Sequence, residues 1–248
     1  KGNDLGNGKA GVFIAGTGAS GGAEASNNVI GGPNPADGNV ISGNGGGITL
    51  GVASNDEAAD GTIIRNNTIG LNDAEDAALP NGAPNSFSAG VFIGLAAESS
   101  SNPTTIRQNT IAGNNDLGIF VFGDSRNVKI DIFDNYVGTN SSFATGLGNG
   151  GDGIVVEPDP SSNGDRTQVV ENIIGANAGS GIVIRGGSHD VLDNFVGAAP
   201  SGADLGNGGD GIVLDRPSSE FVIVGGLTRS SGDGIPGDGA AAGNSTPT

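Results

Sequence analysis

The residues of this chain that could do chemistry are few, and its only histidine comes first. His189 is followed by Asp190 in the stretch GSHDVLDN, with Arg185 shortly before it. A histidine beside a carboxylate, with an arginine to hold an acidic group, could perform general acid–base chemistry on a sugar ring. The alternative is that His189 is an idiosyncratic surface or turn residue, at a position where comparable stretches of the chain carry threonine.

A second candidate patch lies in the stretch GDSRNVKIDIFDN. It places Arg126 and Lys129 close to Asp131. A basic side chain beside carboxylates is suited to proton transfer on an acidic sugar. Acidic residues are frequent in this chain, so coincidence is the competing explanation. The candidate catalytic residues are therefore Arg126, Lys129, Asp131, His189 and Asp190.

Two aspartates are candidate metal ligands. Asp152 and Asp210 occupy the same place in two copies of GNGGDGIV, each directly before a glycine and an apolar run. Carboxylates among glycine and asparagine carbonyls suit Ca²⁺, which takes six to eight oxygen ligands. Comparable stretches have no acid at this position, so solvated surface aspartates are the alternative. We expect no required cofactor and regard Ca²⁺ as a possible one.

The composition excludes several classes of function. The formal net charge is −17, and the chain has no Cys, Met or Trp. An excess of carboxylates opposes binding to nucleic acid and docking on an anionic membrane. No apolar run is long enough to cross a membrane. The 49 glycines separate short β-branched runs, which is typical of strands with turns between them rather than of disorder.

Two short phrases alternate along the chain and define a repeat. The first is a glycine followed by three apolar residues, as in GVFI, and the second is Asn-x-Ile/Val-Gly, as in NTIG. Strands this short bury no face alone, so successive coils must stack in parallel. The sequence therefore predicts an all-β fold, a right-handed parallel β-helix of about seven coils with long loops every second coil. We expect one domain over residues 1–248, with regular coils at about 11–226 and an irregular tail at 227–248.

The asparagines of the second phrase form a column with a structural explanation. Asparagine tolerates the left-handed conformation at a tight corner, and its amide can bond to the asparagine of the next coil. Buried ladders of this kind satisfy their own hydrogen bonds, so a binding role is the less favoured reading. The predicted ladder comprises Asn28, Asn67, Asn109, Asn135, Asn172 and Asn194.

The repeated GNGG segments close long insertions that follow every second coil, at residues 71–89, 139–152 and 198–210. We expect these loops to emerge on one side of the helix. We also expect the glycines and asparagines of GNGG to supply the positive φ values for the return from loop to strand.

A stripe of apolar residues should face outward from the first strand of each coil. By strand alternation these side chains lie on the outer face, where so long an apolar stripe is rarely left bare. Either the loops or the tail fold over it, or another chain contacts it. The stripe comprises Phe13, Phe92, Phe120, Val155, Val183 and Val213.

The pattern resembles the bacterial extracellular right-handed parallel β-helix repeat proteins, within the pectin-lyase-like superfamily in its broad sense. The stretches that carry the resemblance are NTIGLN, NYVGTN, LGNGGDGIVV, LGNGGDGIVL and GNVISGNGGGI. The resemblance implies either an adhesin or repeat protein, or a lyase, hydrolase or epimerase acting on polysaccharides. The sugar-active relatives' catalytic motifs are absent, so none of their catalytic residues carries over.

The favoured interpretation is a secreted or surface-displayed structural rod, with roles in display, self-assembly or glycan attachment. The alternative is a polysaccharide-active enzyme on uronate-containing glycans. The expected partners are copies of the chain or neighbouring repeats of a longer chain, and extracellular polysaccharide. We expect no nucleic acid partner and no membrane insertion.

Overall fold

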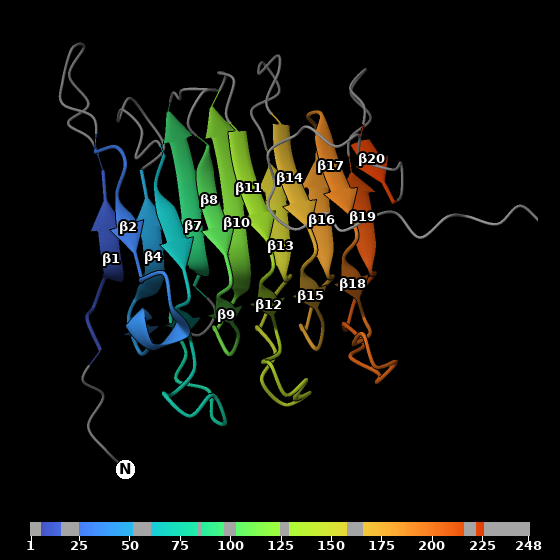
Figure 1. Cartoon of the computed structure of the whole chain (residues 1–248), viewed down its shortest axis with the longest axis horizontal. Helices are drawn as coiled ribbons and strands as arrows, with labels where there is room; N and C mark the ends of the chain where they lie inside the picture. Colours follow the sequence, from blue (N-terminus) through green and yellow to red (C-terminus); the bar gives the residue numbers. More distant parts are fainter. Residues whose placement is uncertain are drawn as a thin grey trace, which may run out of the picture.

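The computed structural model describes residues 6–15, 25–51, 61–83, 86–96, 103–124, 129–157, 166–215 and 222–225. Within these ranges the short β-branched runs form three sheets that share one long axis (Figure 1). Every strand pairs in parallel with its counterpart in the next coil, as in β4 and β7 or β11 and β14. The predicted right-handed parallel β-helix is confirmed.

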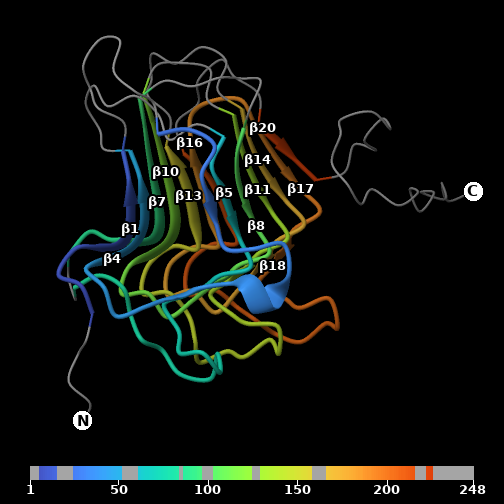
Figure 2. The ribbon, with the colours of Figure 1, turned by 60° about the vertical axis from the view of Figure 1, so that its left-hand side comes forward.

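The strands of each sheet follow one another along the axis at one per coil (Figures 1 and 2). Sheet A consists of β1 (Ala10–Ile14), β4 (Gly46–Leu50), β7 (Ala89–Ala96), β10 (Leu117–Asp124), β13 (Ile154–Glu157), β16 (Ile182–Arg185) and β19 (Ile212–Asp215). Sheet B consists of β2 (Val29–Ile30), β5 (Ile63–Arg65), β8 (Thr104–Arg107), β11 (Lys129–Phe133), β14 (Arg166–Val170), β17 (His189–Leu192) and β20 (Val222–Val224). Sheet C consists of β3 (Val40–Ile41), β6 (Thr68–Ile69), β9 (Thr110–Ile111), β12 (Tyr136–Val137), β15 (Ile173–Ile174) and β18 (Phe195–Val196). One 3₁₀ turn, η1 (Pro35–Asp37), joins β2 to β3.

The core is a set of inward columns, one or two from each sheet. Ile64, Ile106 and Ile132 of sheet B stack in register and are fully buried. Ile69 and Ile111 of sheet C do the same. Each fully buried Val or Ile side chain contributes about 1.5–3 kcal/mol. The coils are therefore held together mainly by the packing of Val and Ile side chains on the same side chains of the next coil.

The first coil departs from the predicted alignment. Val29 and Ile30 pair with Ile63 and Ile64 in sheet B, so the phrase NVIG at Asn28 is a sheet B strand. The sheet C strand of this coil is Val40–Ile41, which pairs with Thr68 and Ile69. The stretch GNVISGN is therefore the regular third strand of coil 1, and Asn28 does not align with Asn67.

The three predicted loops leave from the same side of the helix, the lower side of Figure 1, but their GNGG segments work differently from the prediction. In the two GNGG segments, at residues 148–151 and 206–209, no glycine or asparagine has a positive φ. These glycines are needed because the next coil passes too close: a Cβ on Gly148 would lie 1.8 Å from the carbonyl oxygen of Ala176. A Cβ on Gly208 would likewise lie 2.2 Å from that of Ala178.

Candidate functional site

An asparagine ladder fills the corner between sheets B and C, here called the BC ladder. In each coil the backbone N–H and the side-chain amide of one asparagine donate to Oδ1 of the asparagine in the next coil, at 2.9–3.1 Å. The first member is Asn39 in place of the predicted Asn28, whose amide, among the described residues, donates to the Ala25 carbonyl and not to a ladder asparagine. The BC ladder comprises Asn39, Asn67, Asn109, Asn135, Asn172 and Asn194.

From Asn67 on, the left-handed conformation belongs to the residue before the ladder asparagine, whereas Gly38, before Asn39, has a φ of −72°. Asn66, Gln108, Asp134, Glu171 and Asp193 all have φ between 55° and 57°. The ladder asparagines themselves do not have positive φ. The prediction that asparagine occurs here because it tolerates this conformation was therefore wrong, and the amide bonds explain the column.

A second ladder, the CA ladder, fills the corner between sheets C and A and was missed from the sequence. Its amides bond from coil to coil at 2.9–3.2 Å. Its members are Asn7, Asn44, Asn81, Asn114, Asn149, Asn177 and Asn207. Asn149 and Asn207 are the asparagines of the two GNGG segments, so the repetition of this motif was the signal for the ladder.

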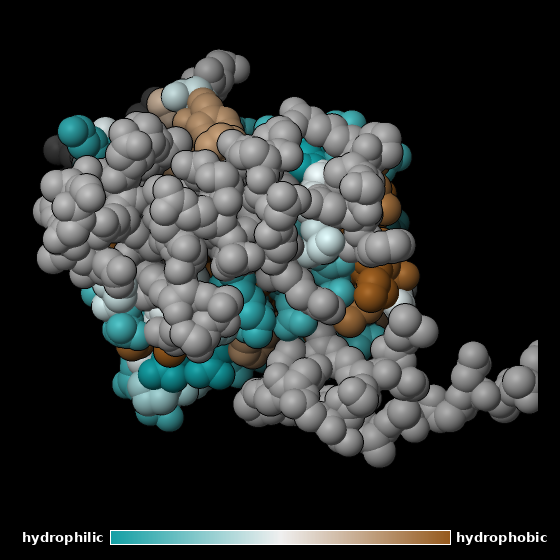
Figure 3. Space-filling view, turned by 90° about the horizontal axis from the view of Figure 1, so that it is seen from above, coloured by the Kyte–Doolittle hydropathy of each residue, from teal (hydrophilic) through white to brown (hydrophobic). Residues whose placement is uncertain are grey.

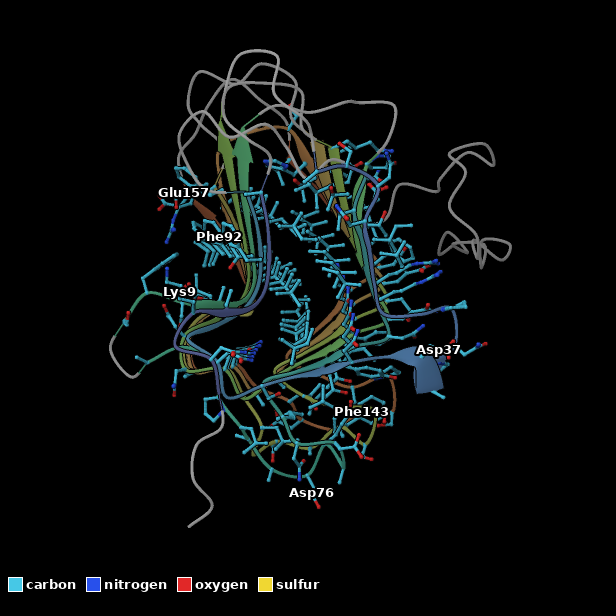
Figure 4. The ribbon with its side chains drawn as sticks, turned by 90° about the vertical axis from the view of Figure 1, so that its left-hand side faces the viewer. Lys9, Asp37, Asp76, Phe92, Phe143 and Glu157 are labelled. Carbon is cyan, nitrogen blue, oxygen red and sulfur yellow. The ribbon has the colours of Figure 1, made fainter. Side chains whose placement is uncertain are left out.

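The apolar stripe on the outer face of sheet A is partly covered. Phe120, Val155 and Val183 are buried, whereas Phe13 is 58% exposed. Phe87, from the loop before β7, packs edge-on against the Phe120 ring at 5.2 Å. Figure 4 shows Phe92 on this outer face. A loop residue thus covers part of the stripe, and lateral contact with another chain stays a prediction.

The candidate catalytic residues do not converge. Lys129 and Asp131 lie on the outer face of sheet B with their charged atoms 3.8 Å apart. His189 lies in the interior of the same sheet, one coil beyond Thr167 and with 1% of its surface exposed. Arg126 lies outside the described residues. The interpretation of His189 as a surface or turn residue was wrong.

The imidazole of His189 is engaged at both nitrogens. Nδ1 accepts a hydrogen bond from the Thr167 backbone N–H at 3.1 Å, and Nε2 lies 2.8 Å from the Gly186 carbonyl oxygen. Because Nδ1 is an acceptor and Nε2 faces an acceptor, the ring is held as the neutral Nε2–H tautomer. Asp190, on the opposite face of β17, lies 3.2 Å from the amide of Gln168. Both residues therefore serve the stacking of β14 on β17.

The two candidate calcium ligands lie in consecutive long-loop coils. Oδ1 of Asp152 accepts a hydrogen bond from the backbone N–H of Ser180 at 2.6 Å, and Asp210 is exposed. Among the residues that the structure describes, no three His, Cys, Asp or Glu side chains lie together as a metal site would need. Calcium binding stays a prediction. The described part of the chain also holds no helix with the length and apolarity to span a membrane.

A groove of about 490 Å³ lies on the outer face of sheet C. Its floor is formed by Thr68, Thr110 and Tyr136, which occupy the same position in three consecutive coils. Its rim is the left-handed corner column Asn66, Gln108 and Asp134, and Glu75 from the loop after β6 also lines it. Figure 4, which looks along the axis, shows the loops of Asp76 and Phe143 on this side of sheet C. The groove could not be predicted from the sequence, since its floor residues come from three coils and only the strand register brings them together.

Comparison with known proteins identifies the family. Residues 1–150 match the family described as periplasmic copper-binding protein (NosD), which is more than half of the chain. No curated protein and no solved structure matches. The chain belongs to this family, whose periplasmic location agrees, at a coarse level, with the expected location outside the cytoplasm.

The donor atoms of this chain do not fit copper, the metal in the family's description. Copper sites in proteins are built mainly on thiolate, thioether and imidazole ligands, and the chain has no Cys, no Met and one His. That histidine is buried, with both nitrogens in contact with backbone groups. No single imidazole in this position can hold a copper ion.

Because the ligands do not fit, we predict that copper does not change the thermal stability of the folded protein. Thermal melting with one equivalent of Cu²⁺, and separately of Cu⁺, should give the same Tm as melting with a chelator, since ligands that bind only the folded state raise Tm. His189→Thr, which restores the threonine found at Thr167, is the matched variant. A saturable one-to-one site by calorimetry that is lost in His189→Thr would contradict the prediction.

Proposed function

We propose that this member of the NosD family is a rigid structural and adhesive rod of the cell envelope. The observation that carries the proposal is the continuity of the two ladders. The BC ladder crosses six coils and the CA ladder seven without a missing bond. Buried amide networks in which every member is satisfied rigidify a core, so the coils should behave as one stiff unit.

A polysaccharide-active enzyme is the second candidate function, and one observation favours it. The carboxylates of Glu75 and Asp134 line the same groove. Two carboxylates across a sugar are the usual machinery of glycoside hydrolysis. The sequence-derived candidates lend this alternative no support, because Lys129 and Asp131 lie on sheet B and His189 lies in the core.

Self-association of the rod is supported by complementary ladder ends. Among the described residues, Asn207 accepts from Asn177 but its own backbone N–H has no acceptor. At the opposite end, Asn7 donates to Asn44, and no described residue donates to its Oδ1. A coil with an asparagine in this position, in the same chain or in a second copy, would complete the bond. Hydrophobic atoms gather at the end of the molecule where β19 and β20 lie (Figure 3), and Leu214 there is 55% exposed.

Electron microscopy and sedimentation velocity over a concentration series test the rod. We expect stiff particles that lengthen end to end as the concentration rises. The series is run once with calcium and once with a chelator, and the particle lengths are compared. Leu214→Glu should keep the particles single because it places a charge at the contact. Leu79→Glu, at a loop residue that is 48% exposed, is the matched control and should assemble normally. Flexible particles would overturn the rod, and single rods at every concentration would overturn self-association. Release of reducing ends from polysaccharide would favour the enzyme.

A further inference from the structure

The groove on sheet C is held in shape by hydrogen bonds. Oγ1 of Thr68 donates to Oε1 of Glu75 at 2.8 Å, which ties the loop to the groove floor. The amide of Asn140, a buried residue of the next long loop, donates to the Glu75 carbonyl oxygen at 2.8 Å. Phe143 packs against the ring of Tyr136 with 6.3 Å between centroids. A site fixed in this way loses little conformational freedom when a ligand binds.

Glu75 occupies an uncommon backbone position for its type. Its φ is +53°, and this left-handed region costs a residue with a side chain about 1–2 kcal/mol. Glycine would remove that cost but also the carboxylate that faces the groove. The corner residues of the BC ladder adopt the same conformation for a structural reason, whereas at Glu75 it places an acidic group against the groove floor.

The groove lining combines one aromatic ring with short polar groups. Tyr136 is half-buried at the floor, and hydroxyls of Thr68 and Thr110 lie in register beside it. The carboxamide of Gln108 is exposed on the rim. Apolar rings with a few directed polar groups are typical of small-ligand sites. A sugar ring has the matching chemistry, because its C–H face packs on an aromatic ring and its hydroxyls bond to amides and carboxylates.

The charge of the lining selects among sugars. Glu75 and Asp134 are both acidic, and no Lys, Arg or His of the described residues lines the groove. A uronate or sulfated sugar would bring a third negative charge against these two, inside a chain whose net charge is −17. Like charges at short range repel strongly where water is partly excluded. Hydroxyl and ammonium groups would instead donate to the carboxylates.

We propose that this groove binds an extended glycan built of pyranose units without carboxylate or sulfate groups, with one ring stacked on Tyr136. The proposal deepens the adhesive part of the proposed function, names its site, and departs from the uronate polymers expected from the sequence.

Affinity electrophoresis and titration calorimetry test the groove, using the whole chain. The probes are neutral oligosaccharides of xylose, mannose and glucose, chitosan oligomers, and polygalacturonate and alginate. We expect binding to the neutral or amino-sugar probes and none to the uronate polymers. Comparison of the neutral oligosaccharides with the chitosan oligomers shows whether the groove binds neutral sugars or amino sugars. Preference for the uronate polymers would overturn the proposal.

Three variants separate the groove from the rest of sheet C. Tyr136→Ala should weaken binding at least tenfold, and Gln108→Ala, at an exposed position, should weaken it without affecting the fold. Phe195→Ala is the matched control, because Phe195 lies in the same outward column two coils away and is 44% exposed. It should bind normally. Equal losses in Tyr136→Ala and Phe195→Ala, or unchanged binding in Gln108→Ala and Tyr136→Ala, would overturn the site. Electron microscopy of the same variants reports on the rod separately, so failure of the groove leaves the rod proposal standing.

Discussion

Replacing Asn135 by alanine should lower the unfolding free energy by about 4 kcal/mol, among the largest effects of any single amide in the chain. Asn135 lies at the centre of the BC ladder and is 1% exposed. It accepts from the backbone and the amide of Asn109 and donates to Asn172. It also donates to the carbonyl oxygens of Ile106 and Phe133. Alanine would remove all of these side-chain bonds and take away the acceptor of the Asn109 backbone N–H, at about 1–3 kcal/mol for each buried group left unpaired where water cannot reach.

Thermal melting followed by circular dichroism measures this loss. For a chain of this length 4 kcal/mol corresponds to a fall in Tm of about 10 °C. Asn28→Ala is the matched control, because Asn28 heads the same sequence phrase but, within the described ranges, its side-chain amide donates to the Ala25 carbonyl and to no neighbouring asparagine. It should cost no more than about 1 kcal/mol. Equal effects in the two variants would show that the amide bonds of the ladder do not hold the coils together.

The contrast between Asn28 and Asn135 shows how far the sequence could lead. The repeat of two phrases predicts the parallel coils, their number and the side on which the long loops emerge. It places Asn28 in the wrong column, because coil 1 carries the phrase twice, at NVIG and at NVIS. Only the pairing of Val40 with Thr68 decides which copy forms the sheet C strand. A short sequence phrase indicates that a strand forms, but the strand's register depends on the residues of the neighbouring coil with which it pairs.

The candidate site was less predictable than the fold for a related reason. Thr68, Thr110 and Tyr136 are separated by tens of residues, and each is the variable second residue of an Asn-x-Ile/Val phrase, so the phrase alone does not single them out. The register of β6, β9 and β12 brings them onto one floor. Glu75 reaches them only because the chain turns back at the bridge between Leu71 and Ala78. His189, in contrast, stands out in the sequence for its chemistry, yet it fills a core position that Thr167 holds in the neighbouring coil.

Replacing Gly138 by alanine should cost about 3 kcal/mol or more, because two penalties combine there. Gly138 ends the sheet C strand of its coil with a φ of +84°. A Cβ at this position would lie 2.2 Å from the carbonyl oxygen of Gly175 in the next coil. The obstacle is backbone, so the coils themselves would have to separate. Such a separation would also stretch the bond from the amide of Asn149 to Asn177.

Gly197→Ala isolates the conformational part of this cost. Gly197 follows Val196 as Gly138 follows Val137, and its φ is +78°. Within the part of the chain that the structure describes, no atom lies within 4 Å of the Cβ that alanine would add. Its loss should therefore be about 1–2 kcal/mol, the cost of a left-handed residue alone. Chemical denaturation of both variants gives the difference directly. If the two variants lose the same unfolding free energy, neighbouring coils can move apart at no energetic cost. The spacing between coils would then not be what requires glycine at Gly138.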